Sequence, residues 1–155
     1  MNGIEKNDNF ISEDGVIFSK DMTQLVRYPS GNERNYYIIP NNVTTILEIS
    51  FKESKNLESI IISNKVEEIQ EYSFELCTKL TNILVEIPSI TCWNNVFYLI
   101  ENEINIQVRH DFSNDFCGKE VNRTDLKCGD NVYYMKDEIS GYLYLYGEGD
   151  TNSYN

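Results

Sequence analysis

Apolar positions in the middle of the chain recur with a fixed spacing of 23 residues. Residues 37–60 and 60–83 superimpose at this shift, so that apolar side chains fall on apolar side chains. The coinciding pairs are Ile39 and Ile62, Val43 and Val66, Ile46 and Ile69, Phe51 and Phe74, Leu57 and Leu80, and Ile60 and Ile83. A period of this length indicates units that stack and bury one continuous core. The pattern therefore predicts a repeat solenoid.

Each unit also carries apolar residues with the spacing L-x-x-I-x-I, which is the signature of a leucine-rich-repeat coil. The spacing occurs at Leu57, Ile60 and Ile62 and again at Leu80, Ile83 and Val85. We expect a short strand at this point of each unit. Residues 48–54 and 71–77 are expected to form one or two helical turns, which Phe51 and Phe74 hold against the core.

The repeats are flanked by stretches in which apolar and polar residues alternate with a period of two. Residues 15–19 and 24–28 surround the polar turn 20–23, and residues 131–146 alternate around the turn 137–141. Both stretches predict β-hairpins. We expect the first hairpin to cap the open end of the solenoid, because a terminal repeat must cover its apolar edge.

The repeat pattern breaks after Val85. No third copy aligns, so we expect a degenerate repeat with a short helix or turn at residues 93–100 and a strand at residues 103–108. The expected fold class is β-rich α+β: a short leucine-rich-repeat solenoid of about 23-residue repeats with flanking β-hairpins. The expected division is a cap at 1–36, two clear repeats at 37–85, the degenerate repeat and closing segment at 86–127, and the C-terminal hairpin at 128–155.

The pattern I-P-x-x-V-x-x-I-x-x-x-x-F-x-x-C-x-x-L-x-x-I resembles the repeat of the BspA-like leucine-rich-repeat family. Cys77 occupies its cysteine position, and Ser54 replaces it in the first copy. The likeness extends to the flanks. Residues 14–29 are similar to the family's N-terminal hairpin, residues 116–121 to the element that closes its arrays, and residues 128–149 to the element that opens a new array.

This resemblance implies a non-enzymatic surface protein, since members occur on the surfaces of bacteria and of mucosal protists. The implied role is binding of a protein or extracellular-matrix ligand in adhesion, at the cell surface or outside the cell. Because the last segment resembles the element that opens a new array, the resemblance also implies that the chain is a fragment of a longer array or a truncated relative. An intracellular scaffold or regulatory protein-interaction domain on the same coil is the alternative.

The charge of the chain excludes some partners. Twenty-five acidic residues against 13 basic ones give a formal net charge of −12, and no stretch concentrates Lys and Arg. Nucleic acid and anionic membrane surfaces bind clustered cations, so we expect neither as a partner. No apolar run approaches the roughly 20 residues that span a bilayer. Direct membrane insertion is therefore not expected. No secretory signal is visible at the N-terminus, so a secreted protein would be a piece without its leader or would leave the cell by another route.

His110 is the only histidine, so a catalytic site that uses an imidazole would have to include it. A cysteine hydrolase would pair His110 with Cys117 and orient the ring through Asp111 or Asp115. The flanking sequence shows no glycine turn for an oxyanion, which favours an exposed histidine and a structural cysteine. No C-x-x-C pair or calcium-loop spacing is present. We therefore expect no catalytic residue, metal or cofactor.

Four cysteines allow two disulfides in three connectivities. Cys77 is expected to be a buried apolar residue of the repeat. A disulfide should therefore join two of Cys92, Cys117 and Cys128, and sequence proximity favours Cys117 with Cys128. Disulfides, or glycans on the sequons at Asn42 and Asn122, would support the surface interpretation, whereas four free thiols would support the intracellular one.

The central x of each L-x-x-I-x-I strand must point away from the core, because successive strand residues face opposite sides. This position is occupied by Ile38, Ile61 and Leu84, which stacking should align as an apolar row. Polar residues around the row are Glu58, Ser59, Thr81 and Asn82. We predict these seven residues as the partner-binding face. The alternative is that the N-terminal hairpin or the tail folds over the row.

Overall fold

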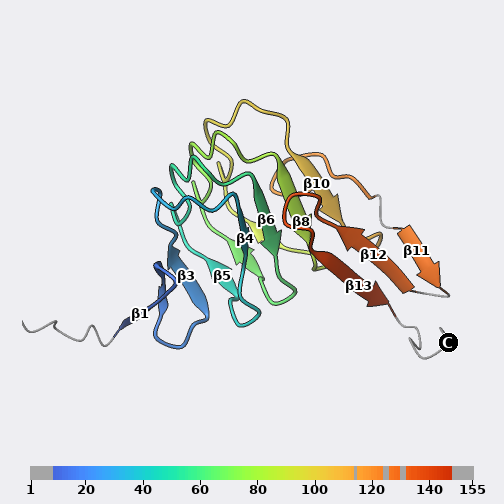
Figure 1. The fold of residues 1–155 in the computed structure, drawn as a ribbon, viewed down its shortest axis with the longest axis horizontal. Coiled ribbons are helices and arrows are strands. Elements are labelled where there is room, and N and C mark those ends of the chain that lie inside the picture. The colour runs from blue at the N-terminus through green and yellow to red at the C-terminus, as the bar shows by residue number, and fades with distance from the viewer. Residues whose placement is uncertain (1–8, 114, 124–125, 130–131, 148–155) are drawn as a thin grey trace, which may run out of the picture.

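The computed structural model describes residues 9–113, 115–123, 126–129 and 132–147, with side chains omitted for 126–129. The chain winds as a short solenoid with one strand layer on each side, and a separate small sheet packs near its C-terminal end (Figure 1). No helix occurs in the described residues. The predicted leucine-rich-repeat solenoid is confirmed.

One layer is a four-stranded parallel sheet in the order β10-β8-β6-β4. Its strands are β4 (Tyr36–Ile38), β6 (Ser59–Ile62), β8 (Asn82–Val85) and β10 (Asn105–Val108). The pairs Tyr37 with Ile60, Ile60 with Ile83, and Ile83 with Ile106 all keep the 23-residue shift. The period read from the sequence is thus the register of the sheet.

The other layer is a six-stranded sheet in the order β1-β2-β3-β5-β7-β9. The N-terminal strands are β1 (Phe10–Glu13), β2 (Val16–Ser19) and β3 (Gln24–Arg27); the repeats add β5 (Thr45–Ile46), β7 (Glu68–Ile69) and β9 (Thr91–Cys92). Asp21 shapes the β2–β3 turn by accepting bonds from the Ser19 hydroxyl at 2.6 Å and the Thr23 hydroxyl at 2.8 Å. The predicted N-terminal hairpin is therefore present, and β3 joins it to the repeats.

The segments expected to be helical are hydrogen-bonded turns instead. In each turn two residues adopt positive φ, at Ile49 and Glu53 in one coil and at Tyr72 and Leu76 in the next. Left-handed residues at this spacing prevent continuous right-handed helix. Their backbone bonds run between coils, as from Phe51 N to Ser73 O at 2.8 Å. The expectation of helical turns is wrong.

Apolar side chains from both layers form one continuous core along the solenoid axis. Aromatic rings stack through it coil by coil, with centroid distances of 5.1 Å between Tyr28 and Phe51, 5.0 Å between Phe51 and Phe74, and 5.5 Å between Phe74 and Phe97. Phe116 lies next along the core, tilted against Phe97 with the ring centroids 6.0 Å apart. All five rings are buried, and Phe51, Phe74 and Phe97 each lie between two other rings of the row.

The third repeat is regular in the structure, although the sequence was expected to degenerate there. Thr91 and Cys92 pair with Glu68 and Ile69 at the 23-residue shift, and residues 94–99 form a turn. Phe97 lies in the core position of Phe74. The copy was overlooked because Ser89 and Cys92 replace the apolar Val66 and Ile69 at the most diagnostic positions.

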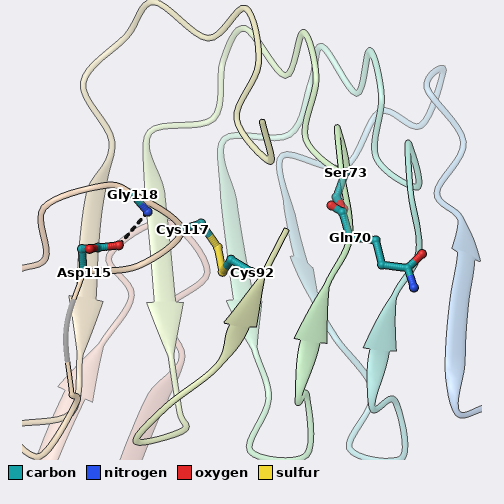
Figure 2. The surroundings of a disulfide bond; sticks show 6 residues. All are labelled: Gln70, Ser73, Cys92, Asp115, Cys117 and Gly118. Atoms are coloured by element: carbon teal, nitrogen blue, oxygen red, sulfur yellow. Dashed lines mark hydrogen bonds between the residues drawn. A yellow bond between two sulfur atoms is a disulfide. The ribbon is translucent and has the colours of Figure 1, made fainter. Parts of the chain in front are cut away.

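A closing loop, residues 109–120, covers the C-terminal end of the core. Figure 2 shows Cys92 of β9 joined to Cys117 of this loop by a disulfide, and Asp115 accepting a bond from the Gly118 N–H at 2.7 Å. In the same view Ser73 lies beside Gln70, to whose carbonyl its hydroxyl donates a hydrogen bond. The disulfide joins two of the three predicted cysteines, but the favoured Cys117–Cys128 pairing is wrong.

Cys77 is free and buried, as predicted. Burial raises the pKa of its thiol to about 12, so it stays protonated at physiological pH. Its Sγ donates to the carbonyl of Phe51 at 3.0 Å.

The predicted C-terminal hairpin is part of a three-stranded antiparallel sheet in the order β11-β12-β13. Its strands are β11 (Leu126–Gly129), β12 (Val132–Lys136) and β13 (Leu143–Gly147). We call β12, β13 and the turn between them, residues 132–147, the C-terminal hairpin.

Candidate functional site

The predicted apolar row exists and lies outside the main core. Strand register places Ile38 beside Ile61 and Ile61 beside Leu84. Ile60 and Ile62 on either side of Ile61 belong to the main core. Ile61 and Leu84 instead form a second apolar cluster with Met135 and Tyr146 of the C-terminal hairpin. The alternation expected of these strands is confirmed.

The C-terminal hairpin covers two of the three row positions. Ile61 and Leu84 are 0% and 1% exposed, whereas Ile38 remains 38% exposed. Of the two arrangements left open by the sequence, the tail therefore folds over Ile61 and Leu84, and the end of the row at β4 stays open. Whether this face binds a partner stays a prediction.

A buried polar contact fixes the tip of the hairpin on the sheet. Ser59, one of the predicted rim residues, donates from its hydroxyl to Asp137 Oδ1 at 2.8 Å. Asp137 Oδ2 accepts a second bond from the Ser140 N–H at 2.6 Å. Both Ser59 and Asp137 are buried. A buried carboxylate needs such donors, so the contact specifies where the hairpin sits.

A second acidic residue, Glu86, lies beneath strand β13 of the hairpin. The Tyr144 hydroxyl donates to the Glu86 backbone carbonyl at 3.4 Å. Burial raises the pKa of the Glu86 side chain, and a hydrogen bond with Tyr142 acts in the opposite direction. The same burial, together with Glu86, raises the pKa of Tyr142. One carboxyl oxygen, Glu86 Oε1, has no hydrogen-bond partner among the residues that the structure describes.

The remaining rim residues stay accessible to solvent. Thr81 is exposed, and Glu58 and Asn82 are half-buried. Their backbones join neighbouring coils, as from Thr81 N to Glu58 O at 3.0 Å. Thr81 and Asn82 also border a groove of about 580 Å³ that extends to the closing loop. The structure thus brings all seven predicted residues to one face, with three covered by the hairpin: Ser59, Ile61 and Leu84.

Residues at the base of the hairpin were not found by sequence reasoning. The His110 ring stacks on Tyr133 with centroids 4.2 Å apart, and the Arg109 guanidinium lies 4.6 Å from the centroid of the Tyr146 ring. Arg109 also forms an ion pair with Asp111 at 2.8 Å. The available signal was the alternation of Tyr142, Tyr144 and Tyr146, which predicted a hairpin but not its contacts.

The structure removes the basis of the cysteine-hydrolase hypothesis. The Cys117 sulfur is bonded to Cys92, so it cannot supply a thiolate. Asp111 binds Arg109 through both carboxylate oxygens, at 2.9 and 2.8 Å, in place of the orienting role imagined for it. In the ranges that the structure describes, no three His, Cys, Asp or Glu residues gather as a metal site would require. No helix there has the length and apolarity needed to cross a membrane.

The family model for the BspA type leucine rich repeat region, in six copies, matches residues 30–139. This range covers well over half of the 155 residues. The chain belongs to this family. The BspA-type match contains the four strands of the parallel sheet, the closing loop and β12. The match therefore includes the third coil, which the sequence pattern predicted to be a degenerate repeat.

Two solved structures resemble the chain. The pneumococcal vaccine antigen PcpA is 22% identical, with a TM-score of 0.46, over 72% of this chain and 40% of that one. A leucine-rich repeat protein from Eubacterium ventriosum is 20% identical, with a TM-score of 0.44, over 67% of this chain and 34% of that one. This BspA-type chain thus spans less than half the length of either protein. No curated protein matches it.

Proposed function

We propose that the chain is a non-enzymatic protein-binding module of the cell-surface type, which contacts a protein or matrix ligand in adhesion. The proposed face is the one predicted from the repeats: Ile38, Glu58, Ser59, Ile61, Thr81, Asn82 and Leu84. The observation that carries the proposal is that this face already holds a polypeptide. The C-terminal hairpin sits on Ile61 and Leu84 through apolar contacts and one buried hydrogen bond from Ser59.

Some residues of this face are exposed to a partner, and others are covered by the C-terminal hairpin. Ile38 and Thr81 are exposed and meet a partner directly. Ile61 and Leu84 become available only if the hairpin moves away or is exchanged for a segment of the partner. Exposed apolar residues with a polar border are typical of protein-interaction surfaces.

The extracellular location is supported by two observations. The Cys92–Cys117 disulfide suits an oxidising compartment, because cytosolic proteins keep their thiols reduced. Asn42 and Asn122, the first residues of the two sequons, are exposed and could carry glycans if the chain enters a secretory pathway. Localisation in the source organism, with and without permeabilisation, tests this part. Staining that requires permeabilisation would favour the intracellular scaffold instead.

The binding face is tested with a matched pair of exposed isoleucines. Ile38→Glu places a charge on the open end of the row, whereas Ile49→Glu does the same on a turn away from this face. Fluorescently labelled variants are added to host epithelial cells and to immobilised extracellular-matrix proteins. We expect Ile38→Glu to lose at least about tenfold in affinity, or about 1.4 kcal/mol, and Ile49→Glu to bind like the unchanged chain. Equal binding by both variants, with both folded, would show that the binding face lies elsewhere.

A further inference from the structure

The third coil carries large apolar side chains on its outer surface. Trp93, Tyr98 and Leu99 are 50%, 46% and 52% exposed. Trp93 directly follows β9 of the six-stranded sheet, and Tyr98 and Leu99 lie in the turn after it. We call these three residues, with Glu68 and Tyr72 of the second coil, the aromatic patch. Exposed apolar groups that gather in one place are typical of interaction surfaces.

The direction of the Trp93 ring follows from its strand. Cys92 packs against the main core, so Trp93 after it points outward. Glu68 also points outward, because Ile69 beside Cys92 belongs to the core. The indole N–H of Trp93 donates to Glu68 Oε1, which holds the ring toward β7. The patch is thus built from the second and third coils together.

The two tyrosines of the patch are linked in the same way. The rings of Tyr72 and Tyr98 meet edge to face, with centroids 5.4 Å apart. The Tyr72 hydroxyl accepts a hydrogen bond from Asn95 Nδ2 at 3.2 Å. Asn95 follows Trp93 by two residues, so the two pairs of contacts lie close together. Contacts between coils therefore hold the aromatic rings in fixed positions.

The patch lies in an acidic part of the chain. Residues 66–103 contain seven acidic residues and one basic residue, Lys79. Lys52 of the first coil is paired with Glu75 at 2.9 Å. The Glu68 carboxylate gives one oxygen to the indole and has a second oxygen that can accept from a ligand. The aromatic patch therefore combines exposed rings with negative charge, which is complementary to a cation.

Among the cationic side chains, arginine matches this combination best. Its planar guanidinium stacks on aromatic rings and donates to carboxylates at the same time. The chain contains one such arrangement, because the Arg109 guanidinium lies 4.6 Å from the centroid of the Tyr146 ring while it pairs with Asp111. Lysine offers a compact charge without a plane that can stack. An anionic ligand would be repelled.

We propose that the aromatic patch binds a basic, arginine-containing segment of a partner protein. A guanidinium of that segment stacks on the Trp93 indole and pairs with Glu68, while its aliphatic groups contact Tyr98 and Leu99. The net charge of −12 attracts such a segment, and added salt weakens its binding. This site is separate from the face around Ile38 on the four-stranded sheet, so it does not depend on the function proposed for that face.

Trp93 itself supplies the measurement, because it is the only tryptophan of the chain. Its fluorescence is followed while octaarginine, octalysine or octaglutamate is added to the full chain. We expect a saturable change with octaarginine, an affinity about fivefold lower for octalysine, and no change with octaglutamate. The affinity for octaarginine should fall as salt is added. Ile38→Glu should bind octaarginine like the unchanged chain, which separates this site from the face described above.

Matched variants locate the binding on the patch. Glu68→Gln keeps an oxygen for the indole N–H but removes the charge, and it should weaken octaarginine binding by about tenfold. Glu33→Gln removes the same charge from an exposed position before β4 and should bind like the unchanged chain. Tyr98→Ala should weaken binding by about fivefold, whereas Tyr36→Ala, at a tyrosine of similar exposure, should not. Circular dichroism checks that each variant is folded.

Three results would overturn the proposal. Equal affinities for octaarginine and octalysine would mean that charge alone attracts the peptides. Equal binding by folded Glu68→Gln and Glu33→Gln would place the site elsewhere on the acidic surface. A change in Trp93 fluorescence with phosphatidylcholine vesicles, but none with octaarginine, would assign the patch to a lipid surface instead of a protein.

Discussion

The two faces of strands β6 and β8 are buried to the same degree by different means. On the inner face, Ile60 and Ile83 are covered by side chains of the neighbouring repeats. Each of these two residues is followed 23 positions later by an equivalent residue. On the outer face Ile61 and Leu84 are covered by a hairpin, whose Asp137 lies 78 residues along the chain from its partner Ser59. The repeats therefore supply the residues of the main core, but the residues that cover the outer face come from the C-terminal hairpin, outside the repeats.

This difference predicts two levels of stability. Each inner residue packs between successive coils, so its loss affects the whole solenoid. The outer cluster connects one hairpin to one sheet, and it can open without disrupting the coils. The following predictions test this division, from the largest expected effect to the smallest.

Phe74→Ala should cause the largest loss. Phe74 is fully buried and its ring lies between those of Phe51 and Phe97. Truncation leaves a cavity between coils and should lower the free energy of unfolding by about 3–5 kcal/mol. Chemical denaturation measures this value. Lys79→Ala, an exposed change in the same coil, should stay within about 0.5 kcal/mol. Similar values for the two variants would contradict the inner core described above.

Ile60→Ala and Ile61→Ala compare the two faces directly, because these neighbours are both 0% exposed. Each truncation should cost about 2–5 kcal/mol in the unit that it affects. Native-state hydrogen exchange should show faster exchange throughout the coils for Ile60→Ala. For Ile61→Ala we expect faster exchange in β12 and β13 alone. Uniform exchange in both variants would show that hairpin and solenoid unfold as one unit.

The sequence predicted the parts of the fold that depend on local repetition. The 23-residue period gave the register of the parallel sheet, and alternation identified both hairpins and the outward direction of Ile61. The third coil was also within reach, since Phe97, Ile106 and Val108 follow Phe74, Ile83 and Val85 at the same spacing. The pattern is interrupted at three positions, where Ser89, Cys92 and Glu103 stand in place of Val66, Ile69 and Leu80.

Other features had no local signal. Ile49, Tyr72 and Leu76 adopt positive φ although none is glycine. The residue types therefore favoured a right-handed helical turn, whereas contacts between coils impose a turn with left-handed residues. The position of the C-terminal hairpin depends on tertiary contacts such as Ser59 with Asp137. The cysteine pairing likewise depends on the fold, which brings Cys92 to Cys117 over a separation of 25 residues.

Ser59→Ala tests the polar contact that fixes the hairpin. The change leaves the buried Asp137 carboxylate without the Ser59 donor, which should weaken hairpin docking by about 1–3 kcal/mol. The expected result is faster amide exchange in β12 and β13, with the denaturation of the coils unchanged. Ser113→Ala removes an exposed hydroxyl elsewhere and serves as the control. Unchanged exchange in Ser59→Ala would mean that the apolar cluster alone holds the hairpin.

The hairpin should also respond to pH through Glu86. Because burial raises the pKa of Glu86, the folded chain keeps a proton that the unfolded chain, with an ordinary pKa of about 4.3, has already lost. The stability that the protonated form contributes is fully present below about pH 4.3. It is lost as the pH rises through the higher pKa of the folded state.

Glu86→Gln isolates this smallest effect, since glutamine fills a similar volume and does not titrate. Relative to the unchanged chain, the variant should gain stability as the pH rises from about 4 to neutrality. Amide exchange in β12 and β13, measured at several pH values and corrected for the intrinsic rate, should show the gain in the hairpin. Glu101→Gln, at an exposed position, should follow the unchanged chain at every pH. A stability difference between Glu86→Gln and the unchanged chain that stays constant with pH would mean that the Glu86 carboxyl ionises under the hairpin as it does in water. The outer face would then tolerate a charge that the inner face, lined by Ile60 and Ile83, does not accommodate.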